Sequence, residues 1–102
     1  MAFERRILSG KEEDIFRESA TPDVFLAGRF AAKEAVMKVL GTGWAKGVTF
    51  RDIEVLKDTE GAPITYLSGV AAERAKALGI KRILVSITHT RDLAVANAIG
   101  DD

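Results

Sequence analysis

The chain has 102 residues, a mass of 11.0 kDa and 47% hydrophobic residues, which is the size and apolar content of a single domain over residues 1–102. Its fifteen basic and fifteen acidic residues balance, so the overall charge argues against a nucleic-acid-binding protein. The chain has no cysteine, which excludes disulfides and a cysteine nucleophile, and no apolar run of membrane-spanning or signal-segment type, so we expect a cytoplasmic protein without membrane contact.

Helices are predicted in the first half of the chain. Ser9 and Glu12 have the spacing of a capping box, which predicts a short helix that ends near Glu18. Pro22 suits the first turn of a second, longer helix, because that position needs no backbone N–H. This helix is expected to end where Gly41 can adopt the left-handed conformation.

Strands are predicted mainly in the second half. Residues 48–57 are rich in strand-forming side chains, and a turn separates them from residues 64–67, so the two segments predict a hairpin. A third helix follows and is expected to end at Gly79. Residues 82–90 and 93–99 predict a second hairpin. The fold class indicated is α+β, with an antiparallel sheet of two hairpins and the long helix packed on it.

The long helix is apolar almost all round, but two narrow charged stripes interrupt it. One stripe carries Arg29 and Lys33, and the other carries Glu34 and Lys38. A helix of this kind is usually covered by protein, where charged side chains need partners. For Glu34 and Lys38 two explanations stay open: an i, i+4 ion pair worth a few tenths of a kcal/mol, or a pair that binds a ligand. A metal bound at this stripe should be a hard ion such as Mg²⁺, with Glu34 as its ligand.

The loop after this helix could approach a phosphate. Gly41, Thr42 and Gly43 offer backbone N–H groups and small side chains next to Lys38. The alternative is that Gly41 only ends the helix.

The single histidine belongs to a second polar segment. His89 is expected at the end of a strand, with Ser86 and Thr88 on the opposite face, where hydroxyl and backbone donors can hold an anion. The alternative is a structural histidine that is hydrogen-bonded at the edge of the sheet.

Several segments along the chain together resemble one enzyme family. They are FLAGRFAAKEA at 25–35, Lys38, GTG at 41–43, DIEV at 52–55, Gly61 with Pro63, and VSITHT at 85–90. Their order and spacing resemble those of holo-acyl-carrier-protein synthases, the phosphopantetheinyl transferases of fatty-acid biosynthesis. The resemblance extends over about residues 3–99.

The resemblance implies a reaction and its partners. Such an enzyme transfers 4′-phosphopantetheine from coenzyme A to a serine of apo acyl carrier protein, depends on Mg²⁺ and leaves 3′,5′-ADP. The family pattern also implies a homotrimer whose pocket lies between subunits. The alternative is an inactive or incomplete relative that binds coenzyme A or a nucleotide without turnover, and a purely structural domain is a third possibility.

The resemblance also implies roles for individual residues. Glu34 matches the Mg²⁺ ligand, which would also help to deprotonate the attacking hydroxyl, and Lys38 matches the lysine that neutralises phosphate charge, with Lys33 assisting. The remaining matches are Gly41, Thr42 and Gly43 as a wall of the coenzyme A pocket, and Ser86, Thr88 and His89 as the element that meets the nucleotide phosphates, with His89 near the 3′-phosphate.

The resemblance has one departure at the N-terminus. Members of the family begin with a strand that carries a Gly-x-Asp motif, whose aspartate is a second metal ligand, followed by a basic helix that docks the carrier protein. Residue 1 of this chain falls after both, and only Phe3 and Arg6 match the end of that helix. We therefore expect an N-terminally shortened version of the domain.

Overall fold

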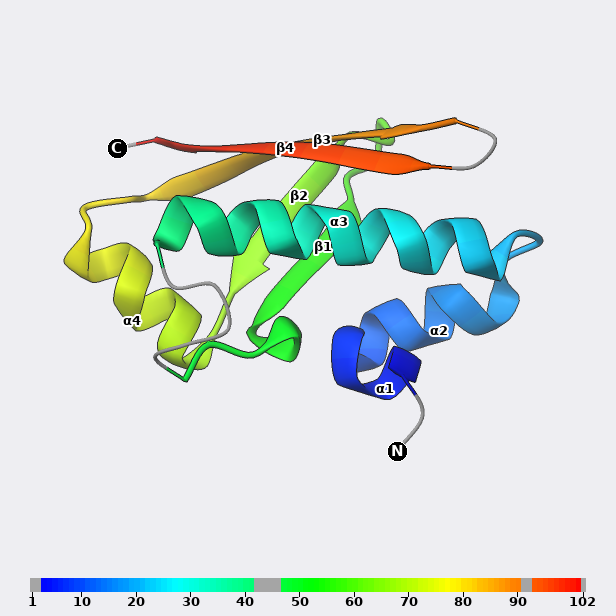
Figure 1. Ribbon diagram of the computed structural model, residues 1–102, viewed down its shortest axis with the longest axis horizontal. Coiled ribbons are helices and arrows are strands. Elements are labelled where there is room, and N and C mark those ends of the chain that lie inside the picture. Colours follow the sequence, from blue (N-terminus) through cyan, green and yellow to red (C-terminus); the bar gives the residue numbers. More distant parts are fainter. Residues whose placement is uncertain (1–2, 42–46, 91–92, 102) are drawn as a thin grey trace.

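The computed structural model describes residues 3–41, 47–90 and 93–101 (Figure 1). Its elements in chain order are α1 (Phe3–Ile7), α2 (Gly10–Glu18), α3 (Pro22–Leu40), the short 3₁₀ helix η1 (Phe50–Asp52), β1 (Ile53–Lys57), β2 (Pro63–Leu67), α4 (Gly69–Ala77), β3 (Arg82–His89) and β4 (Ala94–Asp101). This order confirms the predicted α+β class. Among the described helices, none is both long and apolar enough to cross a membrane.

The predicted helix ends are present. The backbone N–H of Glu12 donates to Ser9 Oγ at 3.3 Å, and the N–H of Ser9 donates to Glu12 Oε1 at 2.8 Å, which completes the capping box of α2. Gly41 follows α3 with a φ of 71°, in the left-handed region. The residue pattern did not predict helix α1, because its five residues are too few to show a helical period; only the family resemblance places the end of a helix at Phe3 and Arg6.

Ser9 also connects α2 to the first strand, since its Oγ donates to Glu54 Oε2 at 2.6 Å. We expect Ser9→Ala to lower the free energy of unfolding by about 1 to 2 kcal/mol, because the cap and this hydrogen bond are both lost. Urea denaturation measures the change. Ser68→Ala is the matched control, because Ser68 stands at the N-cap of α4 without a side-chain cap bond. Equal losses in the two variants would contradict the prediction.

The strands form two hairpins. β1 pairs with β2 and β3 pairs with β4, both antiparallel, and the pairs are separate two-stranded sheets instead of the one sheet that the sequence predicts. The predicted first strand is also shorter at its start. There, the N–H of Asp52 donates to the carbonyl of Thr49 at 3.1 Å and forms the turn of η1, so β1 begins at Ile53.

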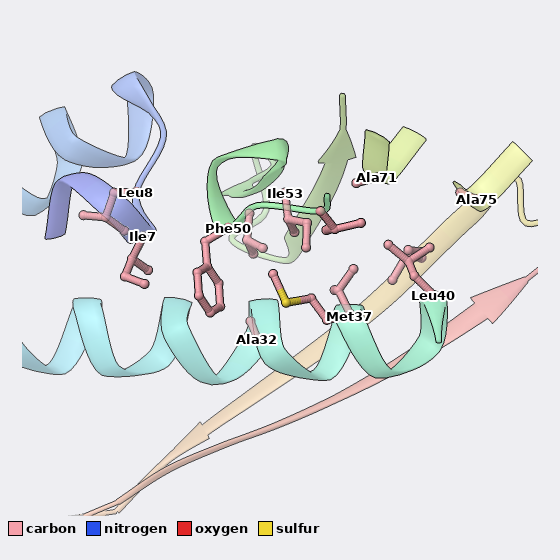
Figure 2. Close-up of a cluster of buried hydrophobic side chains, with 13 residues drawn as sticks. Ile7, Leu8, Ala32, Met37, Leu40, Phe50, Ile53, Ala71 and Ala75 are labelled. Atoms are coloured by element: carbon pink, nitrogen blue, oxygen red, sulfur yellow. The ribbon is translucent and has the colours of Figure 1, made fainter. Parts of the chain in front are cut away.

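Helix α3 lies at the centre, between the β3–β4 hairpin and the group of α1 and α2 (Figure 1). One side of it carries Ala32, Met37 and Leu40, which point into the same buried cluster as Phe50 and Ile53 (Figure 2). All five side chains are buried. The hydrophobic core therefore fixes which side of α3 remains open to solvent.

The β3–β4 hairpin alternates as predicted. Ile83 is buried on the α3 side, whereas Leu84, Val95 and Ile99 on the outer face are 51%, 45% and 65% exposed. Leu84 stands directly opposite Ile99 in the register. The outer face of the hairpin thus presents apolar side chains to solvent.

Candidate functional site

The first charged stripe of α3 is buried. The Lys33 side chain has no exposed surface, and its Nζ donates to Glu12 Oε1 at 2.5 Å and to the carbonyls of Ile7 and Phe50 at 2.5 and 3.1 Å. Burial lowers the pKa of Lys33, and the Glu12 carboxylate opposes this shift. An ammonium held in this way is closed to a ligand, which corrects the prediction that Lys33 assists in phosphate binding.

Arg29, on the same stripe, is only 5% exposed. Its Nε donates to the carbonyl of Val55 at 2.9 Å, and its guanidinium carbon lies 4.5 Å from the centre of the Phe25 ring. Burial lowers the pKa of Arg29, and Glu12 opposes the shift. In the part of the chain that the structure describes, no carboxylate forms an ion pair with Arg29. Its positive charge is therefore not neutralised by a direct ion pair within these residues.

Arg29 lines a cavity of about 930 Å³ between α2, the first turns of α3, the β1–β2 turn and the end of β3. The cavity has basic groups and apolar surface together, with two acids on its α2 side. Its lining includes Lys11, Arg29, Lys57 and His89, the apolar Leu56, Pro63 and Ile87, and the acidic Asp14 and Glu18. Such a lining suits a ligand with an anionic group and a flat apolar part.

His89 reaches this cavity because Gly28 has no side chain. A Cβ atom placed on Gly28 would lie 2.5 Å from His89 Nε2 and 3.4 Å from Ile87 Cγ2. Close approach of a neighbouring group is a common reason for glycine inside a helix. The imidazole of His89 can therefore lie against α3 at the same wall as Arg29.

The second charged stripe lies outside the core. Glu34 is partly exposed and Lys38 is exposed, and neither lines the cavity. Over residues 3–41, 47–90 and 93–101, no ion pair joins Glu34 to Lys38, and no three acidic or histidine side chains form a metal-binding group. The i, i+4 ion pair, one of the two explanations left open for these residues, is therefore not formed. Of the loop that follows, Gly41 ends α3, and Thr42 and Gly43 lie outside the described residues.

The family model of the 4′-phosphopantetheinyl transferase superfamily matches residues 1–98. The chain belongs to this superfamily. A curated transferase relative, the holo-[acyl-carrier-protein] synthase of Halorhodospira halophila, is 50% identical over 97 residues, which are 95% of this chain and 77% of the relative.

Solved structures of transferases have the same fold. The holo-[acyl-carrier-protein] synthase of Neisseria meningitidis superposes with a TM-score of 0.91 at 33% identity, over 100% of this chain and 82% of that one. The Helicobacter pylori synthase in complex with coenzyme A gives 0.81 at 31% identity, over 97% and 81% of the two chains. The Bacillus anthracis synthase in complex with CoA (3′,5′-ADP) gives 0.79 at 37% identity, over 96% and 78%.

Apart from Lys33 and Gly41, the expected site residues that the structure describes lie in three places in this transferase fold. His89 lines the cavity on the α3 side of β3. Glu34 and Lys38 share the open side of α3. Ser86 and Thr88 are exposed on the outer face of β3 and are not brought together with His89 within one chain.

Several residues that line or border the cavity were not predicted as site residues, among them Arg29 in the lining and Gly28 next to His89. Arg29 was recognised only as a charge that needs a partner, and Gly28 only as part of a motif. A signal was present for both. An arginine on an apolar helix without an acid nearby in the sequence indicates a partner from elsewhere in the chain. A glycine inside a strongly helical pattern likewise indicates a close neighbour from elsewhere in the chain.

Proposed function

We propose that this chain transfers 4′-phosphopantetheine from coenzyme A to a serine of apo acyl carrier protein, as a cytoplasmic enzyme of fatty-acid biosynthesis. The names of its relatives and the coenzyme A complexes of similar structures support the substrates. The observation that carries the proposal is the cavity that Arg29, His89 and Lys57 all line. Its cations and apolar surface match the phosphorylated adenosine end of coenzyme A.

In this proposal the cavity holds the nucleotide. Arg29 is pre-oriented by Val55 and by the Phe25 ring, so it can donate to a phosphate without losing much side-chain freedom. His89 meets the 3′-phosphate from the adjacent position. Leu56 and Pro63 offer apolar surface to the adenine ring.

Gly28→Ala is expected to weaken nucleotide binding and to raise stability, so the two effects can be told apart. The added methyl group would displace the His89 imidazole, so we expect the affinity for 3′,5′-ADP to fall about tenfold, the typical effect of losing one charge-assisted hydrogen bond. Helix α3 itself should gain about 0.5 to 1 kcal/mol, because alanine is a better helix former than glycine. Titration calorimetry measures the affinity, and thermal unfolding measures the stability. The control is Ala31→Gly on the open side of α3, the opposite exchange, which should lower the stability of the helix and leave the affinity unchanged. Unchanged affinity would contradict the role given to His89.

The open side of α3 is proposed to act on the diphosphate. Mg²⁺ in proteins is usually held by one or two carboxylates together with substrate phosphates and water, and Glu34 fits that pattern. When bound, the ion would neutralise charge on the departing 3′,5′-ADP. Lys38 adds a second positive charge at the same group, and Glu34 also helps to deprotonate the serine hydroxyl. Gly41, Thr42 and Gly43 are proposed to border the pocket.

We further propose that the site is completed by a second copy in a homotrimer. Within one chain, Glu34 does not line the cavity that contains His89. The exposed apolar residues Leu84, Val95 and Ile99 on the β3–β4 hairpin offer a surface for the neighbouring copy. In that arrangement Ser86 and Thr88, on the same outer face, meet a nucleotide shared between copies.

Incubation with coenzyme A, Mg²⁺ and an apo acyl carrier protein tests the proposal. Intact-mass spectrometry should show that the carrier gains one phosphopantetheine, in step with release of 3′,5′-ADP. EDTA should stop the gain, and replacement of the carrier's acceptor serine by alanine should abolish it. No gain at any Mg²⁺ concentration would reject the transferase function.

The second candidate is a protein that binds coenzyme A or a nucleotide without turnover. It is favoured by the fact that Arg29, His89 and Lys57 come together within one chain. This function predicts calorimetric binding of coenzyme A that does not depend on Mg²⁺, with no mass gain on the carrier protein.

A further inference from the structure

On the edge of β1 that faces away from β2, two side chains form hydrogen bonds with the backbone of a single residue, Val55. The N–H of Val55 donates to Glu12 Oε2 at 2.8 Å, and the carbonyl of Val55 accepts from Arg29 Nε at 2.9 Å. Both bonds are buried. Glu12 and Arg29 thus occupy the place that a neighbouring strand would take, and they satisfy the donor and the acceptor of the same residue.

The Glu12 carboxylate has a fixed orientation. Its side chain is fully buried and accepts hydrogen bonds from the N–H of Ser9 and from Lys33 Nζ on Oε1, and from the N–H of Val55 on Oε2. Lys33 balances its charge. A carboxylate held by donors on both oxygens cannot rotate without breaking a buried bond, which is costly.

We propose that Glu12 is a positioning residue that acts through Val55 to fix the guanidinium of Arg29 in the wall of the cavity. Glu12 holds the N–H of Val55, and the carbonyl of the same residue orients Arg29 Nε. The negative charge of Glu12 also attracts the guanidinium. The consequence for nucleotide binding depends on the proposed function, whereas the effect on Arg29 itself does not.

Glu12→Gln tests the connection from Glu12 through Val55 to Arg29, because it changes only the atom that accepts from the N–H of Val55. In the variant one carboxylate oxygen becomes an amide NH₂. Two donors, one of them charged, point at the Oε1 position, so the amide oxygen should take that place and the NH₂ should face the N–H of Val55. The bond to Val55 is then lost while the acceptor for Lys33 remains. Glu13→Gln, the next residue on α2, makes the same chemical change at an ion pair with Arg17 and is the control.

The primary measurement is the NMR signal of the Arg29 Nε–H group. We expect its hydrogen exchange in Glu12→Gln to be at least about tenfold faster than in the wild type, the change that the loss of a charge-assisted hydrogen bond allows. Amide exchange in the β3–β4 hairpin should stay unchanged, which separates positioning from general loosening. Glu13→Gln should leave the Arg29 signal as it is.

The second measurement is calorimetric titration with 3′,5′-ADP. Glu12→Gln should bind it about tenfold more weakly than the wild type and the control variant do. An unchanged Arg29 exchange rate, or a faster rate with unchanged affinity for 3′,5′-ADP, overturns the inference. If the wild type binds no 3′,5′-ADP while the Arg29 signal still responds to Glu12→Gln, the proposed function fails and the positioning role stands.

A second variant tests the same inference in case Glu12→Gln does not fold. Glu12→Met combined with Lys33→Met replaces the buried ion pair by two apolar side chains of similar volume, a change that usually costs little stability. The Arg29 Nε–H exchange should again be at least about tenfold faster than in the wild type, because the N–H of Val55 no longer has a carboxylate acceptor to hold it. An unchanged rate in this double variant overturns the inference as well.

Discussion

Glu34→Gln is expected to lower the rate of phosphopantetheine transfer by about a hundredfold or more, the usual cost of removing one group that stabilises transition-state charge. A neutral amide is a weak Mg²⁺ ligand and a poor proton acceptor. Stability should change by less than about 0.5 kcal/mol, because Glu34 is partly exposed and makes no ion pair among the described residues. Initial rates of carrier-protein mass gain measure the loss.

The matched control for this variant is Glu73→Gln, an exposed glutamate on α4 that does not line the cavity. It should keep the wild-type rate. If Glu34→Gln also retains more than about a tenth of that rate, Glu34 has no part in the chemistry, since losing a catalytic charge typically costs far more.

Lys33→Met should cause a large loss of stability. Methionine fills a similar volume but leaves the Glu12 carboxylate buried without its cation, and breaking a buried pair in this way costs about 3 to 5 kcal/mol. The hydrogen bonds to the carbonyls of Ile7 and Phe50 are lost as well. The free energy of unfolding from urea denaturation gives the size of the effect.

Two further variants test whether the loss of stability in Lys33→Met comes from breaking the buried ion pair. Lys38→Met, on the open side of the same helix, should change stability by less than about 0.5 kcal/mol. Combining Lys33→Met with Glu12→Gln should recover much of the loss, because the two charges then leave together. A single variant that loses less than about 1 kcal/mol would show that the buried pair is not a main support of the fold.

Local signals in the sequence were sufficient for most of the fold. The capping box at Ser9 and the left-handed Gly41 are decided by neighbouring residues, and both were predicted. The strand at residues 82–90 was also predicted, and it places His89 on the face opposite to Ser86 and Thr88 as expected. Helix α1 and the turn η1 were missed, because each depends on packing: Ile7 and Phe50 are held by the core and not by a period of their own.

The site was only partly predictable because its contacts span long sequence distances. Spacing on α3 separated the two charged stripes but did not tell which one the core would cover. That depends on Glu12, 21 residues before Lys33 and 43 residues before Val55. In the sequence Glu12 has the pattern of a capping residue, and nothing local indicates its other two partners. The same limit concealed Arg29, whose acceptor is 26 residues away.

The proposed site is built from two copies of the chain, with the nucleotide cavity at His89 in one and Glu34 in the next. The most direct test mixes two variants, Glu34→Gln and His89→Ala, after exchange of subunits, and measures transfer to the carrier protein at low coenzyme A. Each variant alone should be slow. The mixture should exceed the mean of the two, because some sites then combine an intact Glu34 with an intact His89. Activity equal to that mean, with both variants folded, would contradict a shared site.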